Sequence, residues 1–380
     1  MRRETCSRLP RKRSKPGLKK VLNPESRKAG SRNRGKQCLI DIPQQAPGFA
    51  FASQALAQST PLYGVTKTVA LGAPDRWDFV VFDPVSHKVF VAHGDRVTVV
   101  DGGSGTVIGN VEGLPGGTHG VAIVPGTKRG YTDDGRAGTA ASFDLDKLNL
   151  IKTIKADADA DAIVFDPISG HVFVVDGDPG KLTVIDPKSD SAVATIDAGS
   201  KLETAVVGGN GKLYVNGEQK QEIVRVDTAT NEIDAHWPIP NCSSPHGLAI
   251  DLETHRLFSS CENNVLVVVD ADTGTTVATL PIGARSDAAA FDPKRKLVFS
   301  SNGDGTLSVI AEKGANSFVT LASVATKVGA RTMALDPESG RLYLVAGDTT
   351  INPSADPSDF RHRYVVTPGS AKLLFLDPMP

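Results

Sequence analysis

Residues 161–175 decide the fold, and they read DAIVFDPISGHVFVV. Two short runs rich in Val, Ile and Phe flank a turn that contains Asp166, Pro167 and Gly170. Runs of β-branched and aromatic residues bounded by such turn residues are typical of two antiparallel strands in a tight hairpin. The same pattern recurs along the chain, which makes this segment one copy of a repeat.

The copies return at a nearly constant interval. Their shared position, an Asp in most copies, is occupied by Asp83, Val124, Asp166, Gly208, Asp251, Asp292 and Asp336. The spacings between these residues are 41, 42, 42, 43, 41 and 44. Seven copies at one such period indicate a repeat architecture and not a series of unrelated domains.

Each copy predicts four short strands. In the fifth copy they cover residues 246–250, 256–261, 265–269 and 275–281, with turns rich in Asp, Asn, Thr and Gly between them. An aromatic residue recurs in the second strand of every copy, at Phe90, Tyr131, Phe173, Tyr214, Phe258, Phe299 and Tyr343. We expect these seven side chains to pack between neighbouring copies.

The repeat predicts a seven-bladed β-propeller. One four-stranded sheet cannot bury both of its faces, whereas radially stacked sheets bury them and leave only short edges. A (β/α)₈ barrel has a similar period, but it requires a helix in each unit, and these units contain strands and turns. The last copy ends after its third strand, residues 371–377, and residues 65–71 supply the missing fourth strand. The predicted fold is therefore all-β, a propeller over residues 58–380 that is closed by its N-terminal strand.

Residues 1–57 differ in composition from the rest of the chain. They carry fourteen Lys or Arg and three Asp or Glu, whereas residues 58–380 carry 28 and 40. A basic segment that is poor in large apolar residues is expected to be disordered. Ala55-Leu56-Ala57 before Gln58 resembles the cleavage site of a secretory signal peptide, which predicts a periplasmic or extracellular protein. A disordered tail with a chance Ala-x-Ala, or a start codon placed too far upstream, would also explain this leader.

The acidic propeller argues against nucleic acid as a partner, because affinity for the phosphate backbone depends on Lys and Arg. The sequence has no apolar run of about 18 residues, so we expect no membrane span. We also expect a monomer.

Two of the four cysteines lie in the fifth copy. Cys242 precedes the first strand and Cys261 ends the second, and antiparallel pairing places the start of one strand beside the end of its neighbour. This arrangement predicts a Cys242–Cys261 disulfide, which export would permit. Two free buried thiols are the alternative.

A polar or charged residue stands five positions before the shared position in every copy. These seven residues, called the ring below, are Asp78, His119, Asp161, Glu203, His246, Asp287 and Arg331. Each is expected at the start of the innermost strand of its blade, around one mouth of the central channel. A packing position would vary through Val, Ala and Leu, so the ring predicts ligand binding at this mouth.

The ring offers two kinds of ligand chemistry. His119, His246 and Asp161 are candidate ligands of a divalent metal ion, because imidazole favours zinc, copper or iron and carboxylates also accept calcium, magnesium or manganese. Arg331 is a candidate anchor for an anionic substrate. The same mouth could be rimmed by Arg76, Lys201 and Arg285, each two residues before a ring member. A water-filled polar channel without a ligand is the alternative.

Loops at the same mouth add further candidates. The insertion at residues 347–370 is longer than the other hairpins, and long loops on a rigid scaffold often bind ligands. Its charged residues include Asp356, Asp359, Arg361, His362 and Arg363. The hairpins between second and third strands are also expected to line the mouth, with His93, Asp134, Asp176, Asn216 and Asn302. For the insertion, a disordered loop without a ligand is the alternative.

Three segments show a more specific pattern: Leu182-Thr-Val-Ile-Asp186, Thr306-Leu-Ser-Val-Ile310 and the turn at 270–277. With the repeat over residues 62–380, they resemble the YVTN-type propeller family. The sequence departs from the family at the Tyr-Val-Thr-Asn tetrad itself, which is replaced, for example, by Phe-Val-Ala-His93. The resemblance implies an exported or surface protein that binds or scaffolds. Related propellers include lactonases and the metal-binding propeller of nitrous oxide reductase, and the WD-repeat signature is absent.

These observations lead to one favoured function and two alternatives. We favour a non-catalytic exported protein that binds a protein or a small molecule at its channel mouth. The first alternative is a metal-assisted hydrolase, such as a lactonase, with the ring at the metal. The second is an accessory redox or metal-handling propeller. The sequence contains no phosphate-binding loop, nucleophile elbow or His-Glu-x-x-His motif. No catalytic residue is therefore assigned, and a divalent metal ion is the one candidate cofactor.

Overall fold

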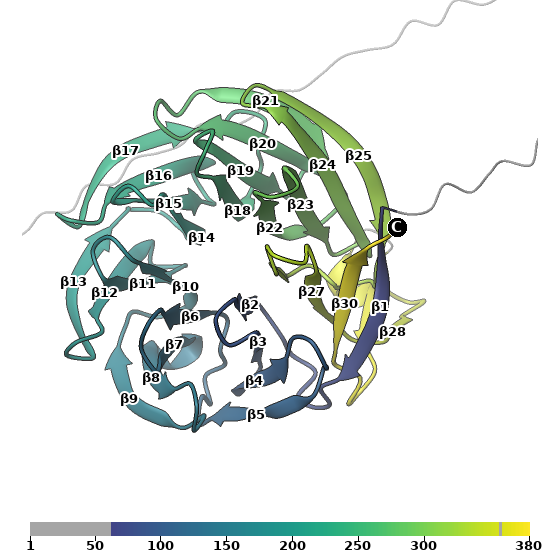
Figure 1. Cartoon of the computed structure of the whole chain (residues 1–380), viewed down its shortest axis with the longest axis horizontal. Helices are drawn as coiled ribbons and strands as arrows, with labels where there is room; N and C mark the ends of the chain where they lie inside the picture. Colours follow the sequence, from purple (N-terminus) through teal and green to yellow (C-terminus); the bar gives the residue numbers. More distant parts are fainter. Residues whose placement is uncertain (1–61, 357–358) are drawn as a thin grey trace, which may run out of the picture. The chain divides into compact units, whose positions relative to one another are not determined.

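The described part of the chain is a ring of blades. The structure, a computed structural model, describes residues 62–356 and 359–380. These residues form seven four-stranded antiparallel sheets around a central axis, as Figure 1 shows. The predicted all-β, seven-bladed propeller is therefore confirmed. The leader at residues 1–57 and its boundary with Gln58 lie outside the described residues.

The first four blades use consecutive strands, and in each the first strand lies nearest the axis. Blade 1 contains β2 (Val80–Asp83), β3 (Lys88–His93), β4 (Arg96–Asp101) and β5 (Val107–Glu112). Blade 2 contains β6 (Val121–Val124), β7 (Arg129–Asp134), β8 (Thr139–Asp144) and β9 (Leu150–Lys155). Blade 3 contains β10 (Ala160–Asp166), β11 (His171–Asp176), β12 (Lys181–Asp186) and β13 (Ser191–Asp197). Blade 4 contains β14 (Leu202–Val207), β15 (Lys212–Gly217), β16 (Glu222–Asp227) and β17 (Glu232–Pro238).

The last three blades complete the ring. Blade 5 contains β18 (Pro245–Asp251), β19 (Arg256–Cys261), β20 (Val265–Asp270) and β21 (Thr276–Pro281). Blade 6 contains β22 (Ser286–Asp292), β23 (Leu297–Asn302), β24 (Thr306–Gly314) and β25 (Ser317–Ala325). Blade 7 combines β26 (Met333–Leu335), β27 (Leu342–Ala346) and β30 (Lys372–Pro378) with the N-terminal strand β1 (Tyr63–Ala70).

The ring closes as the sequence predicts. Strand β1 pairs antiparallel with β30, from Tyr63 opposite Pro378 to Ala70 opposite Lys372. The completed blade 7 packs against both of its neighbours, blades 6 and 1. Tyr63 packs edge-on against Phe299 of blade 6, and Tyr343 of blade 7 stacks on Phe82 of blade 1, with centroids 5.2 and 5.4 Å apart. The two ends of the described propeller thus share one blade.

The core lies between the blades. All seven aromatic residues of the second strands are at most 1% exposed, which confirms that they are packing residues. The hydrophobic clusters cross blade boundaries; one, for example, joins Tyr131 of blade 2 to Ile163, Val172 and Val174 of blade 3. Because each blade buries its faces against two neighbours, the fold holds the innermost strands rigidly around the axis.

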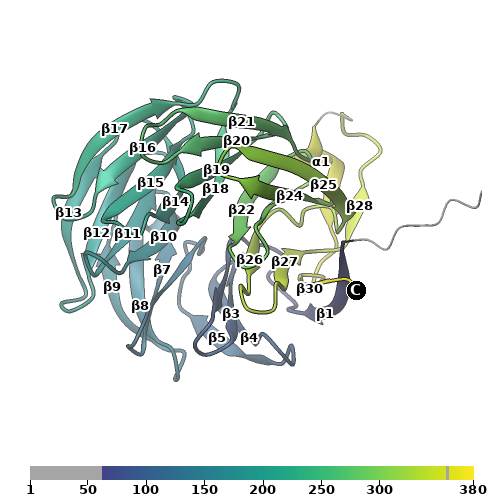
Figure 2. The ribbon, with the colours of Figure 1, turned by 45° about the horizontal axis from the view of Figure 1, so that its top comes forward.

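The predicted insertion in blade 7 forms a small hairpin of its own. It contains β28 (Thr349–Ile351), the short helix α1 (Phe360–Arg363) and β29 (Tyr364–Val366). Figure 2 shows it beside blade 7. A 3₁₀ turn, η1 (Gly135–Ala137), joins β7 to β8 in blade 2. Among the described residues, no helix is long and apolar enough to cross a membrane.

Candidate functional site

The structure places all seven ring residues where the innermost strands begin. Four of them are the second residues of β10, β14, β18 and β22, and Asp78, His119 and Arg331 lie two residues before the starts of β2, β6 and β26. Their charges act on one another. The pKa of Arg331 is raised by Asp287 above all, and the more distant ring carboxylates add to this effect against the burial of the guanidinium.

Asp78, His119 and Asp161 form the first of two groups within the ring. Each offers one nitrogen or oxygen atom that could bind a metal, and these atoms lie within 4.8 Å of one another. One imidazole and two carboxylates are a donor set that fits zinc, manganese or iron. Gly135 packs against the His119 imidazole, where a Cβ atom would approach Cε1 to 2.5 Å, so this arrangement requires glycine.

A fully buried carboxylate, that of Asp133, fixes the orientation of His119. It accepts the backbone N–H groups of His119 and Gly120, both at 2.6 Å. Nδ1 of His119 lies 3.2 Å from Asp133 Oδ1 and 2.9 Å from the carbonyl oxygen of Ala160. Both neighbours are acceptors, so Nδ1 carries a proton and leaves Nε2 for a further partner.

The carboxylates around His119 favour its charged form. Burial alone would lower the pKa of His119, but Asp133, Asp78 and Asp161 together raise it to about 10. Arg76 approaches Nε2 to 3.3 Å, and it can donate a hydrogen bond there only while Nε2 is unprotonated. The carboxylates are held close to the imidazole, whereas the exposed side chain of Arg76 can turn into solvent, so the charged form of His119 is favoured.

Three ring carboxyl groups hold their protons more tightly than isolated ones. Burial raises the pKa of Asp78 to about 8, although the charge of Arg331 opposes the change. Burial also raises the pKa of Asp161 to about 6, against the charge of His119, and it raises the pKa of Glu203 well above its usual value. The ring therefore carries less negative charge at neutral pH than its composition suggests.

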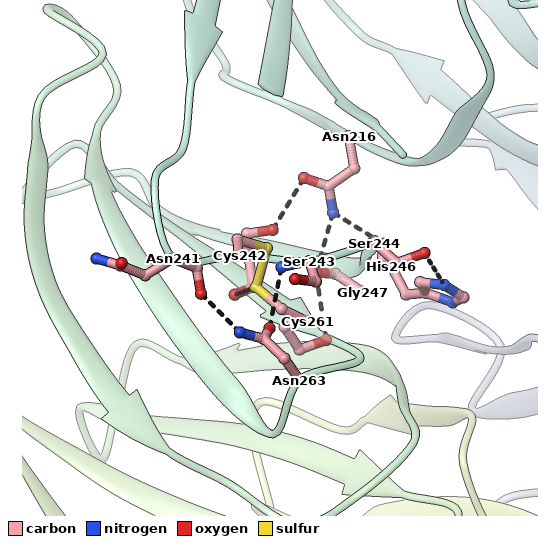
Figure 3. The surroundings of a disulfide bond; sticks show 11 residues. Asn216, Asn241, Cys242, Ser243, Ser244, His246, Gly247, Cys261 and Asn263 are labelled. Carbon is pink, nitrogen blue, oxygen red and sulfur yellow. Dashed lines mark hydrogen bonds between the residues drawn. A yellow bond between two sulfur atoms is a disulfide. The ribbon is translucent and has the colours of Figure 1, made fainter. Parts of the chain in front are cut away.

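Glu203, Glu218 and His246 form the second group, whose candidate ligand atoms also lie within 4.8 Å of one another. Lys201 already pairs with it, since its Nζ atom lies 2.8 Å from Glu218 and 3.9 Å from Glu203. The hydroxyl of Ser244 donates to Glu218 at 2.7 Å and lies 3.3 Å from Nε2 of His246, a contact drawn in Figure 3. Because an ammonium group neutralises these carboxylates, this group fits a metal ion less well than the first.

His246 also connects the second group to Arg331, through the carboxylate of Asp287. Its Nδ1 atom lies 3.0 Å from Oδ1 of Asp287, whose other oxygen pairs with Nη1 of Arg331 at 2.9 Å. Burial would lower the pKa of His246, but the hydrogen bond and charge of Asp287 raise it. The side chain of Arg331 as a whole remains 42% exposed.

The structure distributes the predicted metal ligands over both groups: His119 and Asp161 belong to the first, and His246 to the second. It also adds three residues that the sequence analysis missed, namely Asp133, Glu218 and Ser244. Each stands at a position whose residue type differs from copy to copy of the repeat. No periodic signal marks them, and only the folded arrangement brings them to the ring.

A pocket of about 370 Å³, called the mouth pocket below, opens beside the ring. His246, Asp287 and Arg331 of the ring line it. Its other lining residues are Asp75, Arg76, Trp77, Glu262, Arg285, Ser286, Gly303, Val328, Gly329, Thr349, Tyr364 and Val366. The predicted rim residues Arg76 and Arg285 are thus part of it, whereas Lys201 pairs with the second group.

The insertion of blade 7 contributes one wall of the mouth pocket, as expected for a long loop at this mouth. Thr349 of β28 and Tyr364 and Val366 of β29 line the pocket. None of the charged residues described between 356 and 363 is among the lining residues. Asp359 and His362 instead pair with each other at 2.6 Å.

The polar residues at the hairpins between second and third strands do not line the mouth. His93, Asp134, Asp176, Asn216 and Asn302 are at most 5% exposed. They bind neighbouring groups within and between blades: Asp176 accepts the hydroxyl of Thr183 at 2.7 Å, and Asn216 donates to the carbonyl oxygen of His246 at 2.8 Å. The expectation that they face the channel is therefore wrong, because the blade backbone needs them as internal hydrogen-bond partners.

A disulfide joins Cys242 to Cys261, with the sulfur atoms 2.01 Å apart (Figure 3). It ties the segment before β18 to the end of β19. Asn263 supports the same segment, because it accepts the backbone N–H of Ser243 and donates to the carbonyl oxygen of Asn241. This segment carries Ser244 and leads directly into His246, so the disulfide positions one edge of the ring.

Comparisons with known proteins agree with the fold. No family model matches the chain, and no curated protein matches it either. The WD40 repeats of RRP9 align with a TM-score of 0.67 at 11% identity, covering 83% of this chain and 97% of that one. A chain of the mitotic checkpoint complex aligns with a TM-score of 0.67 at 15% identity, covering 90% and 98%. A chain of hydrazine synthase from Kuenenia stuttgartiensis aligns with a TM-score of 0.62 at 16% identity, covering 71% and 92%. At such identities the similarity shows a WD40-like seven-bladed fold and nothing about function.

Proposed function

We propose that this protein is a binding propeller that holds a small ligand at the mouth of its central channel. The mouth pocket carries this proposal, because ring residues and the β28–β29 hairpin both line it. Its volume of about 370 Å³ lies in the range of small-molecule sites. It combines the apolar or aromatic side chains of Trp77, Val328, Tyr364 and Val366 with charged groups that can orient a ligand.

The WD40-like fold commonly serves as a scaffold for protein interactions, and a protein segment could occupy the same mouth. We favour a small molecule because the pocket is compact and its walls come from several separate parts of the chain. Trp77 lies between β1 and β2, Val328 lies with Arg331 between β25 and β26, and Tyr364 begins β29. Rigid blades hold these segments in place before a ligand arrives, which lowers the entropy lost on binding.

A filled pocket tests this function. Val328→Tyr places a ring into the mouth pocket, and Val319→Tyr adds the same ring to the outer strand β25, where Val319 is 47% exposed. Saturation-transfer NMR on the full chain with mixtures of small metabolites measures binding. We expect the unchanged protein and Val319→Tyr to bind the same compounds and Val328→Tyr to lose them. Binding that survives Val328→Tyr would place the site elsewhere, and an absence of binding in all three proteins would refute the function.

A metal centre in the first group is a second candidate function. The observation that favours it is the support of His119 by Asp133, which leaves Nε2 beside the carboxylates of Asp78 and Asp161. A divalent ion there would have to displace a proton from His119, and it would supply Lewis-acid chemistry of the kind a lactonase uses. The residues of this chain would hold the ion and orient a substrate in the adjoining mouth pocket.

Elemental analysis separates the two candidates. The full chain is purified without a metal-affinity tag, incubated with zinc or manganese and dialysed, beside His119→Gln and His246→Gln. A metal centre in the first group predicts about one equivalent that is lost in His119→Gln and kept in His246→Gln. Metal-free protein in all samples would exclude this candidate and leave the mouth pocket as the site.

We further propose that the protein is exported and belongs to the YVTN-type propellers. The Cys242–Cys261 disulfide supports export, because disulfides persist in oxidising compartments. The seven blades and the repeat motifs support the family. Alkylation of the unreduced protein from cell fractions, followed by mass spectrometry, tests export: we expect Cys242 and Cys261 to be protected in the exported fraction, and labelled thiols there would contradict the proposal.

A further inference from the structure

We propose that the mouth pocket selects a small organic anion, a carboxylate or phosphate attached to an aromatic or similar flat apolar body. This inference rests on the proposed function and names the chemical class of its ligand. Two features of the pocket point to this class: the guanidinium groups that converge on it, and the ring faces that lie beside them.

Three arginines reach the pocket from three separate segments. Arg76 lies between β1 and β2, Arg285 between β21 and β22, and Arg331 between β25 and β26. Arginine is the side chain best suited to carboxylate and phosphate groups, because its planar fork donates two parallel hydrogen bonds. Arg76 is exposed and Arg331 is 42% exposed, so both can present N–H groups to a ligand.

The carboxylates of the pocket are mostly occupied by other donors. Asp75 accepts the backbone N–H groups of Gly369, Ser370 and Ala371 at 2.6, 2.9 and 3.2 Å, and it thereby holds the end of the insertion in place. Asp287 binds His246 through one oxygen and Arg331 through the other.

Glu262, the third acid of the pocket, is exposed to water. Arg76, which is exposed, and the part of Arg331 that does not bind Asp287 therefore remain as N–H donors, and a ligand that supplies acceptors fits them.

The apolar part of the pocket determines the rest of the ligand. Trp77 and Tyr364 line it from opposite ends of the chain, with Val328 and Val366 beside them. Aromatic side chains favour flat apolar groups through stacked or edge-on packing. The volume of about 370 Å³ lies at the small end of ligand sites, which favours a compact molecule over an oligosaccharide or a peptide.

Tryptophan fluorescence provides a direct test. The chain has two tryptophans, Trp77 in the pocket and Trp237 on the outer strand β17, so Trp237→Phe leaves Trp77 as the sole reporter. The full chain with this change is titrated with benzoate, benzamide and benzamidine, which share one shape and carry a negative, zero and positive charge. Phenyl phosphate is the fourth probe, and it distinguishes a phosphate site from a carboxylate site. Saturation-transfer NMR on the chain with both tryptophans repeats the comparison in case Trp237→Phe impairs folding.

We expect benzoate or phenyl phosphate to change the Trp77 emission at concentrations at least tenfold lower than benzamide and benzamidine. Arg76→Gln and Arg331→Gln should each lower the affinity for the anionic probe at least tenfold. Arg136→Gln, at an exposed arginine of η1 outside the pocket lining, should leave it unchanged.

Benzamide or benzamidine binding as tightly as benzoate would overturn the anion inference and leave the proposed function intact. A second outcome would have the same meaning: none of the four probes changes the Trp77 emission, while other compounds bind the unchanged protein and lose their binding in Val328→Tyr. If no compound binds in either experiment, both proposals fail.

Discussion

The buried carboxylate of Asp133 sets the orientation and the protonation of its neighbour His119. Asp133 receives two backbone N–H groups and the imidazole Nδ1, so its carboxylate is satisfied although it has no contact with water. A buried charge of this kind is stable only with such partners. The position and the protonation of His119 therefore both depend on Asp133.

Asp133→Asn should lower the pKa of His119 from about 10 toward its usual value of 6.5, because the carboxylate is the main group that raises it. The free energy of unfolding should fall by about 3 kcal/mol, since the amide cannot accept every hydrogen bond that the carboxylate accepts. NMR titration of the imidazole measures the pKa. Asp272→Asn, beside the exposed His255, is the matched control and should leave His119 unchanged. A wild-type His119 that titrates near 6.5 would contradict this account.

Asp161 makes stability depend on pH in a direction opposite to that of a salt-bridged acid. Its pKa is about 6 in the folded protein and about 4 in an unfolded chain, so the folded state binds more protons. The folded state therefore loses stability as the pH rises from about 4 through 6. Asp161→Asn removes this loss.

Asp161→Asn should thus increase the free energy of unfolding by roughly 1–3 kcal/mol at pH 8 and leave it unchanged near pH 4. Urea denaturation at pH 4, 6 and 8 measures the difference. Asp197→Asn, on the exposed face of β13, is the control. A variant less stable than the wild type at pH 8 would mean that His119 stabilises the Asp161 carboxylate more than burial destabilises it.

At the scale of single elements, the segment before β18 depends on its disulfide. Cys242 and Cys261 are 19 residues apart, and closing a loop of that length stabilises a fold by about 3 kcal/mol. Both cysteines are buried, so Cys242→Ala/Cys261→Ala should lower the free energy of unfolding by about that amount. Denaturation with and without reductant measures it. A loss below about 1 kcal/mol, or equal stability of the wild type after reduction, would contradict this role.

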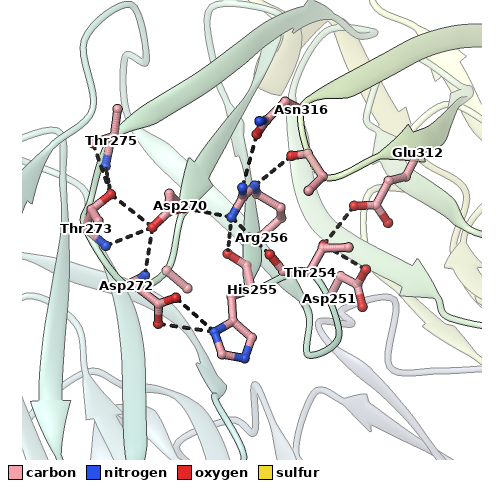
Figure 4. A network of polar contacts seen from close by, with 12 residues as sticks. Asp251, Thr254, His255, Arg256, Asp270, Asp272, Thr273, Thr275, Glu312 and Asn316 are labelled. Carbon is pink, nitrogen blue, oxygen red and sulfur yellow. Dashed lines mark hydrogen bonds and ion pairs between the residues drawn. The ribbon is translucent and has the colours of Figure 1, made fainter.

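The second element is the hairpin of β24 and β25, whose contacts with blade 5 could not be predicted from the sequence. Figure 4 shows how Arg256 of blade 5 reaches it. Its guanidinium donates to Asp270 at 2.8 Å within its own blade, and to the carbonyl oxygen of Ala315 and to Asn316 at 2.7 and 3.0 Å across the boundary. A basic residue stands two positions before the aromatic residue of the second strand in most copies, and Arg129 and Arg341 also reach the next blade. The group that each contacts there differs, so the repeat predicts the strands but not these bridges.

At the scale of the whole molecule, the shared last blade closes the ring. Tyr63 is 1% exposed and packs against Phe299, whereas Val65 on the same strand is 43% exposed. Tyr63→Ala should lower the free energy of unfolding by about 3–5 kcal/mol, and Val65→Ala should change it by less than about 1 kcal/mol. Urea denaturation followed by circular dichroism measures both. Equal effects of the two changes would mean that β1 does not contribute to the core.

The period of the sequence predicts the fold and the ring, but only part of the site. Blade number, strand order, closure by β1 and the inward aromatic residues all follow from residues that recur every 41–44 positions. The polar residues at the ends of the second strands also recur, yet they serve the backbone, because periodicity does not distinguish an exposed polar group from a buried one. Asp133 and Ser244 each occur once at their position of the repeat, and Glu218 recurs only as Glu262, so the packing of the blades is needed to reveal them. The walls of the mouth pocket combine Trp77 with the insertion near the other end of the chain.

The most direct test of the central claim is a crystal structure of the full chain with the tightest ligand found by the NMR screen. The account predicts that the ligand lies in the mouth pocket, with its flat face against Trp77 and Tyr364 and an acidic group at Arg76 or Arg331. A ligand bound on any other surface, with only water in the mouth pocket, would contradict it.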